Sequence, residues 1–228
     1  MDTLTSPVLV ISPHLDDGVF SCGQLLAHNP GSWVVTVFAG EPTNGAVITS
    51  WDTACGFGNA AQAMQARRAE DAAATAMVSA RARWLDFLDS QYGATPGVEA
   101  VSDALSALIR ELAPSTVCFP AGLFHSDHVL VHDAVLALLR RQPRRDWIMY
   151  EDALYRRQPG LLQTRLGRMQ AHGIAVTPLR LPMPDASWAL KSAALACYGS
   201  QLRALRSVAA GHEDALAPEG YWRVAVPP

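Results

Sequence analysis

The segment VLVISPHLDDG, residues 8–18, decides how the rest of the chain is interpreted. It begins with four apolar residues, mostly β-branched, and continues with Ser-Pro, which is typical of a buried β-strand that ends near residue 12. His14, Asp16 and Asp17 then follow the carboxyl end of that strand, where open α/β sheets bind their ligands. His14 and Asp17 could bind one cation together, while Asp16 would stay free beside it. We therefore expect a metal site at the end of this strand.

Apolar strands alternate with helical patterns along most of the chain. We expect strands near residues 7–12, 33–40, 83–89, 116–120, 147–150 and 174–181, and helices near 17–28, 59–80, 97–112, 129–139, 160–171 and 187–207. Residues 41–58 show no clear period, so we expect a long loop that could cover a site. This alternation predicts an α/β, Rossmann-like fold, with a mostly parallel sheet and helices on both faces.

The length and composition favour a single domain. We expect residues 1–228 to form one domain, with a Rossmann-like core over 1–152 and a C-terminal extension over 153–228. The formal net charge of -3 provides no field that would attract nucleic acid or an anionic membrane, so we expect a small-molecule partner. No apolar run approaches the ~20 residues of a spanning helix, and the N-terminus lacks a signal-like pattern. We therefore expect a cytoplasmic protein, and oligomerisation stays possible.

A second cluster of histidine and aspartate, HSDH at residues 125–128, follows the fourth expected strand. The two clusters become neighbours if both strands lie near the centre of one sheet. Two histidines and one carboxylate form a set that suits zinc in hydrolytic sites, where one position stays open for water. We predict that His14, Asp17 and His128 bind one Zn²⁺ per chain, although such a set also accepts other divalent ions.

The remaining residues of the two clusters have the chemistry of a hydrolytic mechanism. We predict that Asp16 is the general base that takes a proton from the attacking water. His125 would donate to the oxyanion or to the leaving group, and Asp127 would accept from a ligand imidazole. A simpler interpretation is that the two aspartates only cap a helix and that residues 125–128 form a surface cluster. The presence of both clusters at strand ends favours the metal site.

The two motifs resemble those of a known family. Residues 13–17, PHLDD, resemble the P-H-x-D-D signature of the PIG-L/LmbE-like zinc N-deacetylases, and HSDH resembles their H-x-D-H signature. The looser matches are the R-x-x-E pattern of Arg67 to Glu70, Asp89, Lys191, Tyr198, Ser200 and Gln201. Two positions depart from the pattern: Gly18 stands where many members have Glu, and Leu123 stands where one branch has a Tyr that helps the oxyanion.

The resemblance implies a fold, a cofactor and an activity. Members have a Rossmann-like fold, bind zinc, and remove acetyl groups from N-acetylglucosamine in glycolipids, thiol cofactor precursors and natural products. The implied function is metal-dependent hydrolysis of the N-acetyl amide of an amino sugar or related glycoconjugate. By analogy Arg67 and Asp89 would contact the substrate, although an ion pair on a helix face and a turn would explain them equally well.

Several alternatives stay open from the sequence. The protein could be an amidase of a sugar-thiol or natural-product conjugate, or a non-catalytic, ligand-binding Rossmann-like protein. The first strand is not followed by G-x-G-x-x-G, and no G-x-S-x-G occurs, which argues against a dinucleotide site and a serine hydrolase. His132 follows His128 by one turn, and we expect a helix-face residue rather than a ligand. The acids Glu151 and Asp152, after Tyr150, could serve either the pocket or a turn.

Overall fold

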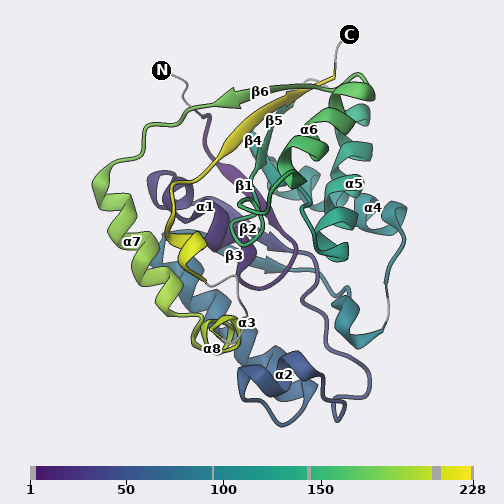
Figure 1. The fold of residues 1–228 in the computed structure, drawn as a ribbon, viewed down its shortest axis with the longest axis vertical. Helices are drawn as coiled ribbons and strands as arrows, with labels where there is room; N and C mark the ends of the chain where they lie inside the picture. Colours follow the sequence, from purple (N-terminus) through teal and green to yellow (C-terminus); the bar gives the residue numbers. More distant parts are fainter. Residues whose placement is uncertain (1–3, 94, 143–144, 207–211, 227–228) are drawn as a thin grey trace.

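The computed structural model describes residues 4–93, 95–142, 145–206 and 212–226. Its centre is one seven-stranded sheet with the order β3-β2-β1-β4-β5-β7-β6 (Figure 1). The strands are β1 Val8–Ser12, β2 Trp33–Thr36, β3 Arg81–Trp84, β4 Thr116–Pro120, β5 Asp146–Tyr150, β6 Ala175–Leu179 and β7 Tyr221–Ala225. Strands β1 to β5 are parallel to one another, and β7 runs antiparallel to both β5 and β6. The predicted Rossmann-like, mostly parallel sheet is confirmed.

Helices cover both faces of the sheet (Figure 1). They are α1 Asp17–His28, α2 Ser50–Cys55, α3 Ala60–Met77, α4 Val98–Leu112, α5 Ser126–Arg141, α6 Leu161–Ala171, α7 Asp185–Ala196 and α8 Gly199–Leu205. Because successive side chains of a strand point to opposite faces, Leu9 and Ile11 of β1 join one apolar core, with α4, α5 and α6. Val8 and Val10 join the other core, with α1, α3, α7 and α8. Every residue of β1 is therefore buried.

The order of the strands reverses at the middle of the sheet. The chain passes from β1 outward to β2 and β3, then returns to place β4 on the other side of β1. In the register of this pair, Val10 lies opposite Cys118, so the carboxyl ends of β1 and β4 are adjacent. Such a reversal leaves a crevice beyond the strand ends, which is where α/β sheets bind ligands. The two His/Asp motifs follow these two strands.

Two elements near the site differ from expectation. The loop expected over residues 41–58 contains α2, which begins with a capping box in which Thr49 and Asp52 each bond the other's backbone N–H. Helix α5 begins at Ser126 rather than near residue 129. Asp127 and His128 therefore lie in the first turn of a helix, and the helix fixes their directions.

The C-terminal third of the chain differs more from the elements expected from the sequence. The helix expected over residues 187–207 is two helices, α7 and α8, separated at Cys197 and Tyr198, and residue 207 lies outside the described part of the chain. Strand β7 was not expected, and it fills the position between β5 and β6. Among the described residues, no helix combines the length and the apolar character that crossing a bilayer requires.

Candidate metal centre

The turn after β1 is held by its own polar groups. The Ser12 hydroxyl donates to the carbonyl of His14 at 2.6 Å and accepts from the backbone N–H of Gly18 at 2.8 Å. A Cβ at residue 18 would lie 3.0 Å from Val34 Cγ1 and 3.1 Å from Ser12 Cβ. Close packing therefore explains why residue 18, which departs from the family pattern, is a glycine. A larger residue would push the turn away from the sheet.

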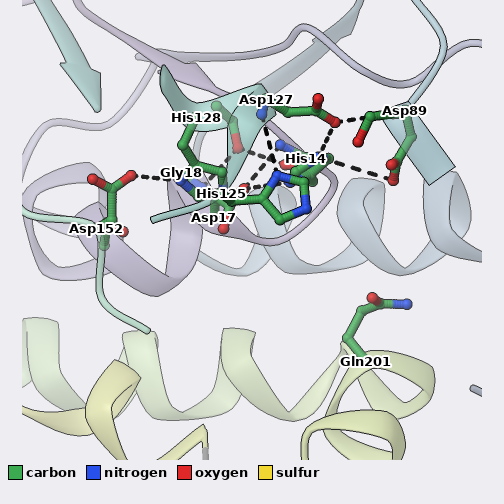
Figure 2. Close-up of polar contacts among 12 residues, drawn as sticks. His14, Asp17, Gly18, Asp89, His125, Asp127, His128, Asp152 and Gln201 are labelled. Carbon is green, nitrogen blue, oxygen red and sulfur yellow. Dashed lines mark hydrogen bonds and ion pairs between the residues drawn. The ribbon is translucent and has the colours of Figure 1, made fainter. Parts of the chain in front are cut away.

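His14, Asp17 and His128 converge at the sheet crevice (Figure 2). Asp17 Oδ2 lies 3.1 Å from His14 Nδ1 and 3.0 Å from His128 Nε2. All three side chains are buried. Two imidazoles and one carboxylate within this space form a donor set that suits zinc. The structure thus brings together the three residues that the sequence predicted as ligands.

Each of the two histidines has a carboxylate on its other ring nitrogen (Figure 2). Asp127 Oδ2 lies 3.0 Å from His14 Nε2, and Asp152 Oδ1 lies 2.6 Å from His128 Nδ1. If these nitrogens carry the protons, the lone pairs of His14 Nδ1 and His128 Nε2 face Asp17. Asp127 therefore lies where the sequence suggested, and Asp152, whose role the sequence left open, is its counterpart.

The backbone fixes both of these carboxylates. Asp127 Oδ2 also accepts from the N–H of Ser90 at 3.0 Å, and Asp152 Oδ2 accepts from the N–H of Leu123 at 3.1 Å. Both carboxylates are buried, so the directions of the two imidazoles are set by groups that cannot rotate freely.

The charges around the site favour a cation. The acidic side chains are Asp16, Asp17, Asp89, Asp127 and Asp152, and the neighbouring permanent cation is Arg67. Burial lowers the pKa of His128, but Asp17 and Asp152 outweigh it and raise that pKa to about 9. Burial likewise lowers the pKa of His14, and Asp89, Asp127 and Asp17 outweigh it, so the pKa is raised. A metal ion would replace these protons.

Asp16 lies in the same turn and lines a cavity of about 220 Å³ beside the three predicted ligands. Burial, and then the charge of Asp17, raise the pKa of this carboxyl to about 7. A carboxylate with a pKa near neutrality, in a cavity beside a metal site, has the properties of a general base.

His125 precedes α5 and lines the cavity as well. Its Nδ1 accepts from the N–H of Asp127 at 3.2 Å, so the neutral ring carries its proton on Nε2. Burial and the nearby His14 and His128 lower the pKa of His125 below its usual value. At neutral pH this ring is therefore an uncharged donor.

Arg67 and Asp89 line the same cavity. Arg67 is 3% exposed, and its Nη1 lies 3.6 Å from Asp89 Oδ2. Its Nε and Nη1 have no hydrogen-bond partner among the described residues, which is unusual for a buried guanidinium. Arg68 instead donates to the carbonyl of Ala39, outside the cavity. The structure thus places Arg67, and not Arg68, where a substrate oxygen could be bound.

Other candidates have structural roles. His132 is buried and donates from Nδ1 to the carbonyl of Pro120 at 2.9 Å, which is a structural contact. Tyr150 donates to the carbonyl of Ile11, and Glu151 accepts from Trp222. Tyr155 and Gln201 line the cavity, the former from the turn after β5, where no sequence motif indicated a site residue.

Comparisons with known proteins agree with this geometry. The family model for GlcNAc-PI de-N-acetylases, PIG-L, matches residues 9–139. A comparison with curated protein sequences found no match. Among solved structures, the chain is similar to the triple mutant Orf2*T of a deacetylase of the teicoplanin biosynthetic pathway, with 28% identity, a TM-score of 0.80, and 96% of this chain and 98% of that chain covered.

Two further structures share the fold. One is the A40926 pseudoaglycone deacetylase Dbv21, with 25% identity, a TM-score of 0.74, and 95% of this chain and 96% of that chain covered. The other is the zinc-inhibited form of the teicoplanin deacetylase Orf2, with 24% identity, a TM-score of 0.78, and 96% of this chain and 97% of that chain covered. Since the family model spans more than half of the residues, the chain belongs to the PIG-L family of de-N-acetylases.

Proposed function

We propose that this protein hydrolyses the N-acetyl amide of an amino sugar that is carried by a glycopeptide or a related natural-product conjugate. The observation that carries the proposal is the match over almost the whole of both chains to the deacetylase of the teicoplanin pathway. The similar A40926 pseudoaglycone deacetylase supports the same substrate class. Arg67 and Trp51 also line the cavity, so the cavity offers both polar groups and an aromatic face to a sugar.

We propose His14, Asp17 and His128 as the zinc ligands, with Asp127 and Asp152 orienting the two imidazoles. The donor set fits the ion, because the three side chains are buried together and each histidine has a carboxylate on its second nitrogen. Zinc bound there would polarise the acyl carbonyl and lower the pKa of water.

The protein's own groups then move the protons. Asp16 takes a proton from the water as its oxygen bonds to the acyl carbon. The same carboxyl then passes this proton to the amide nitrogen, the C–N bond breaks, and acetate and the free amine are released. His125 donates from Nε2 to the acyl oxygen or to the leaving nitrogen. Arg67, which lines the cavity, binds a substrate oxygen, and Asp89 keeps the guanidinium in place and accepts from a sugar hydroxyl.

The experiment that tests this function is a screen of N-acetylglucosaminyl compounds in which released acetate is measured. The panel contains a glycopeptide pseudoaglycone, a glycolipid, a sugar-thiol conjugate and the free sugar, each with the zinc-loaded protein. We expect the highest kcat/KM for the glycopeptide, and we expect Asp16→Asn to bind zinc normally while losing turnover by about 10²- to 10⁴-fold.

The same screen separates the alternatives. Preference for the sugar-thiol or glycolipid would refute the glycopeptide assignment and keep the deacetylase. No acetate from any compound, with zinc bound, would support a non-catalytic ligand-binding protein. The cytoplasmic location and the division into a core over 1–152 and an extension over 153–228 stay predictions.

A further inference from the structure

Tyr155 differs from the other tyrosines in the described part of the chain, because its hydroxyl has no hydrogen-bond partner there. The hydroxyl partners of the others are Asp52 for Tyr92, the Ile11 carbonyl for Tyr150, Asp71 for Tyr198 and Glu219 for Tyr221. A phenol that is partly buried and unpaired is a free donor, and buried polar groups usually have partners. A bound molecule could therefore supply the missing acceptor.

The position of Tyr155 is in the catalytic cavity. It lines the same cavity as Asp16 and His125. Its ring packs edge-on against the ring of His128, with 5.2 Å between the ring centroids and 78° between the planes. Burial, and then the charges of Asp17 and Asp16, raise the pKa of the Tyr155 hydroxyl, so this hydroxyl lies within the field of the carboxylates.

The turn after β5 holds Tyr155 firmly. The N–H of Tyr155 donates to the carbonyl of Asp152 at 3.0 Å, and Asp152 is the residue that orients His128. The Phe124 ring packs against the Tyr155 ring at a tilt of 34°, with 5.4 Å between centroids, although Phe124 is 66% exposed and has a φ of 61°. The guanidinium of Arg156 fastens the same turn by donating to the carbonyls of Pro218 and Asp214. The phenol is thus preorganised rather than free to swing.

We propose that Tyr155 is a catalytic residue whose hydroxyl donates a hydrogen bond to the acyl oxygen as that oxygen becomes an oxyanion. The proposal rests on the proposed function, because it assigns a role in the same reaction. The phenol keeps its proton throughout, so no proton balance changes. A donor placed where negative charge develops stabilises the transition state more than the bound substrate.

Leu123 provides no side-chain donor that would compete with this role. The residue is buried and apolar, so it offers no side-chain donor, although its backbone N–H binds Asp152. Tyr155 then provides the acyl oxygen with a donor from a different loop, and His125 is free to serve the leaving nitrogen. The two residues would therefore divide the tasks that the sequence assigned to His125 alone.

The variant Tyr155→Phe tests the proposal, because it removes the hydroxyl and keeps the ring that packs against His128. We expect kcat for the best substrate of the acetate screen to fall by about 10²-fold, while KM changes less than about 3-fold. Zinc content, measured by metal analysis, should equal that of the wild type. The control is Tyr221→Phe, which removes a buried phenol hydroxyl that bonds Glu219 and is not among the residues that line the cavity, and which should keep kcat.

A binding measurement provides a readout besides activity. A phosphonamidate in which a tetrahedral phosphorus replaces the acyl carbon imitates the transition state, and the free amine is the product. We expect Tyr155→Phe to weaken binding of the phosphonamidate by a factor similar to the loss in kcat, and to leave binding of the amine unchanged. Calorimetry on the zinc-loaded proteins measures both.

The outcomes are distinct. An active wild type with unchanged kcat and phosphonamidate affinity in Tyr155→Phe would overturn the role of Tyr155 alone. Loss of zinc from Tyr155→Phe would also overturn it, because the effect would then be on the metal site. A wild type that releases no acetate from any compound would overturn the proposed function and the role of Tyr155 with it.

Discussion

One oxygen of Asp152 lies 2.6 Å from Nδ1 of His128, and its other oxygen accepts from the backbone of Leu123. A single carboxylate therefore sets both the ring of a predicted zinc ligand and the loop that precedes α5. Asp127 likewise contacts both the ring of His14 and the backbone N–H of Ser90. The metal centre thus depends on two carboxylates that would not touch the metal.

Removal of the charge at Asp152 is expected to weaken zinc binding. Asp152→Asn keeps an acceptor for His128 but loses the negative charge that makes the imidazole a stronger ligand, so we expect the Kd for zinc to rise about 10- to 100-fold. Competition with a chelator measures this constant. The control is Asp103→Asn, which removes an exposed carboxylate paired with Arg141 and should leave the Kd unchanged. Equal affinities in Asp152→Asn and the wild type would contradict the orienting role.

The activity is expected to fall at acidic pH because the base becomes protonated. The pKa of Asp16 is raised to about 7 by burial and by Asp17, and only the deprotonated carboxylate accepts a proton. We therefore expect kcat/KM to rise with pH up to about 7. The positive charge of bound zinc favours the deprotonated carboxylate, so with zinc bound this rise should occur at a lower pH. A profile from pH 5 to 9 measures this. An activity that increases as the pH falls from 7 to 5 would exclude Asp16 as the base.

Stability is expected to depend on the pH through His132. Burial, and then the charge of Arg165, lower the pKa of His132 to about 3, while the unfolded chain has the usual value of about 6.5. The lowered pKa means that the stability contribution is complete above about pH 6.5 and is lost as the pH falls toward 3. Between pH 7.5 and 5.5 the wild type should lose about 1.4 kcal/mol of unfolding free energy through this residue.

The variant His132→Asn isolates that contribution. Asn can donate to the carbonyl of Pro120 as Nδ1 of the histidine does, but it takes up no proton in this range. Urea unfolding of both zinc-saturated proteins at the two pH values gives the difference. If both proteins lose the same free energy between pH 7.5 and 5.5, His132 is not the group responsible.

Gly122 is expected to resist substitution. Its φ is 71°, and a Cβ would lie 2.6 Å from His132 Cβ and 3.0 Å from the carbonyl oxygen of His128. Gly122→Ala should therefore cost about 1–3 kcal/mol of stability and displace the first turns of α5, which lowers zinc affinity. Thermal unfolding and chelator competition measure the two effects.

Gly160 provides the matched control, because its φ is 82° and nothing lies within 4 Å of its Cβ position. Gly160→Ala should show only the cost of the backbone conformation, about 1 kcal/mol, with normal zinc affinity. An equal loss in both variants would show that the contact with His132 has no effect.

The central part of the fold could be predicted from sequence because its signals are local. The apolar runs of β1 and β4 are continuous, and each is followed by a polar motif, so both the strands and the neighbourhood of His14 and His128 could be inferred. The helix α2 also has a local signal, the capping box of Thr49 and Asp52, but it lies in a segment without hydrophobic periodicity.

Other features depend on distant segments and could not be predicted. The contact of Asp152 with His128 joins residues on two loops, and the place of Tyr155 in the cavity depends on the turn between them. Tyr198 bonds to Asp71 in α3, and the break between α7 and α8 lies at that residue, so tertiary contact rather than propensity ends the helix. Arg67 could be suggested only by the family resemblance, and its unpaired N–H groups became visible in the structure.

Strand β7 has a consequence for the order in which the sheet can form. It follows every other described strand in the sequence, yet it lies inside the sheet and provides the hydrogen-bonding partner of β6. During synthesis, β6 would therefore emerge with no strand to pair with and wait until residues 221–225 arrive. Until then β5 exposes an open edge, which is the kind of edge that pairs with other chains. A chain cut before Tyr221 would keep both predicted metal motifs and still be prone to aggregate.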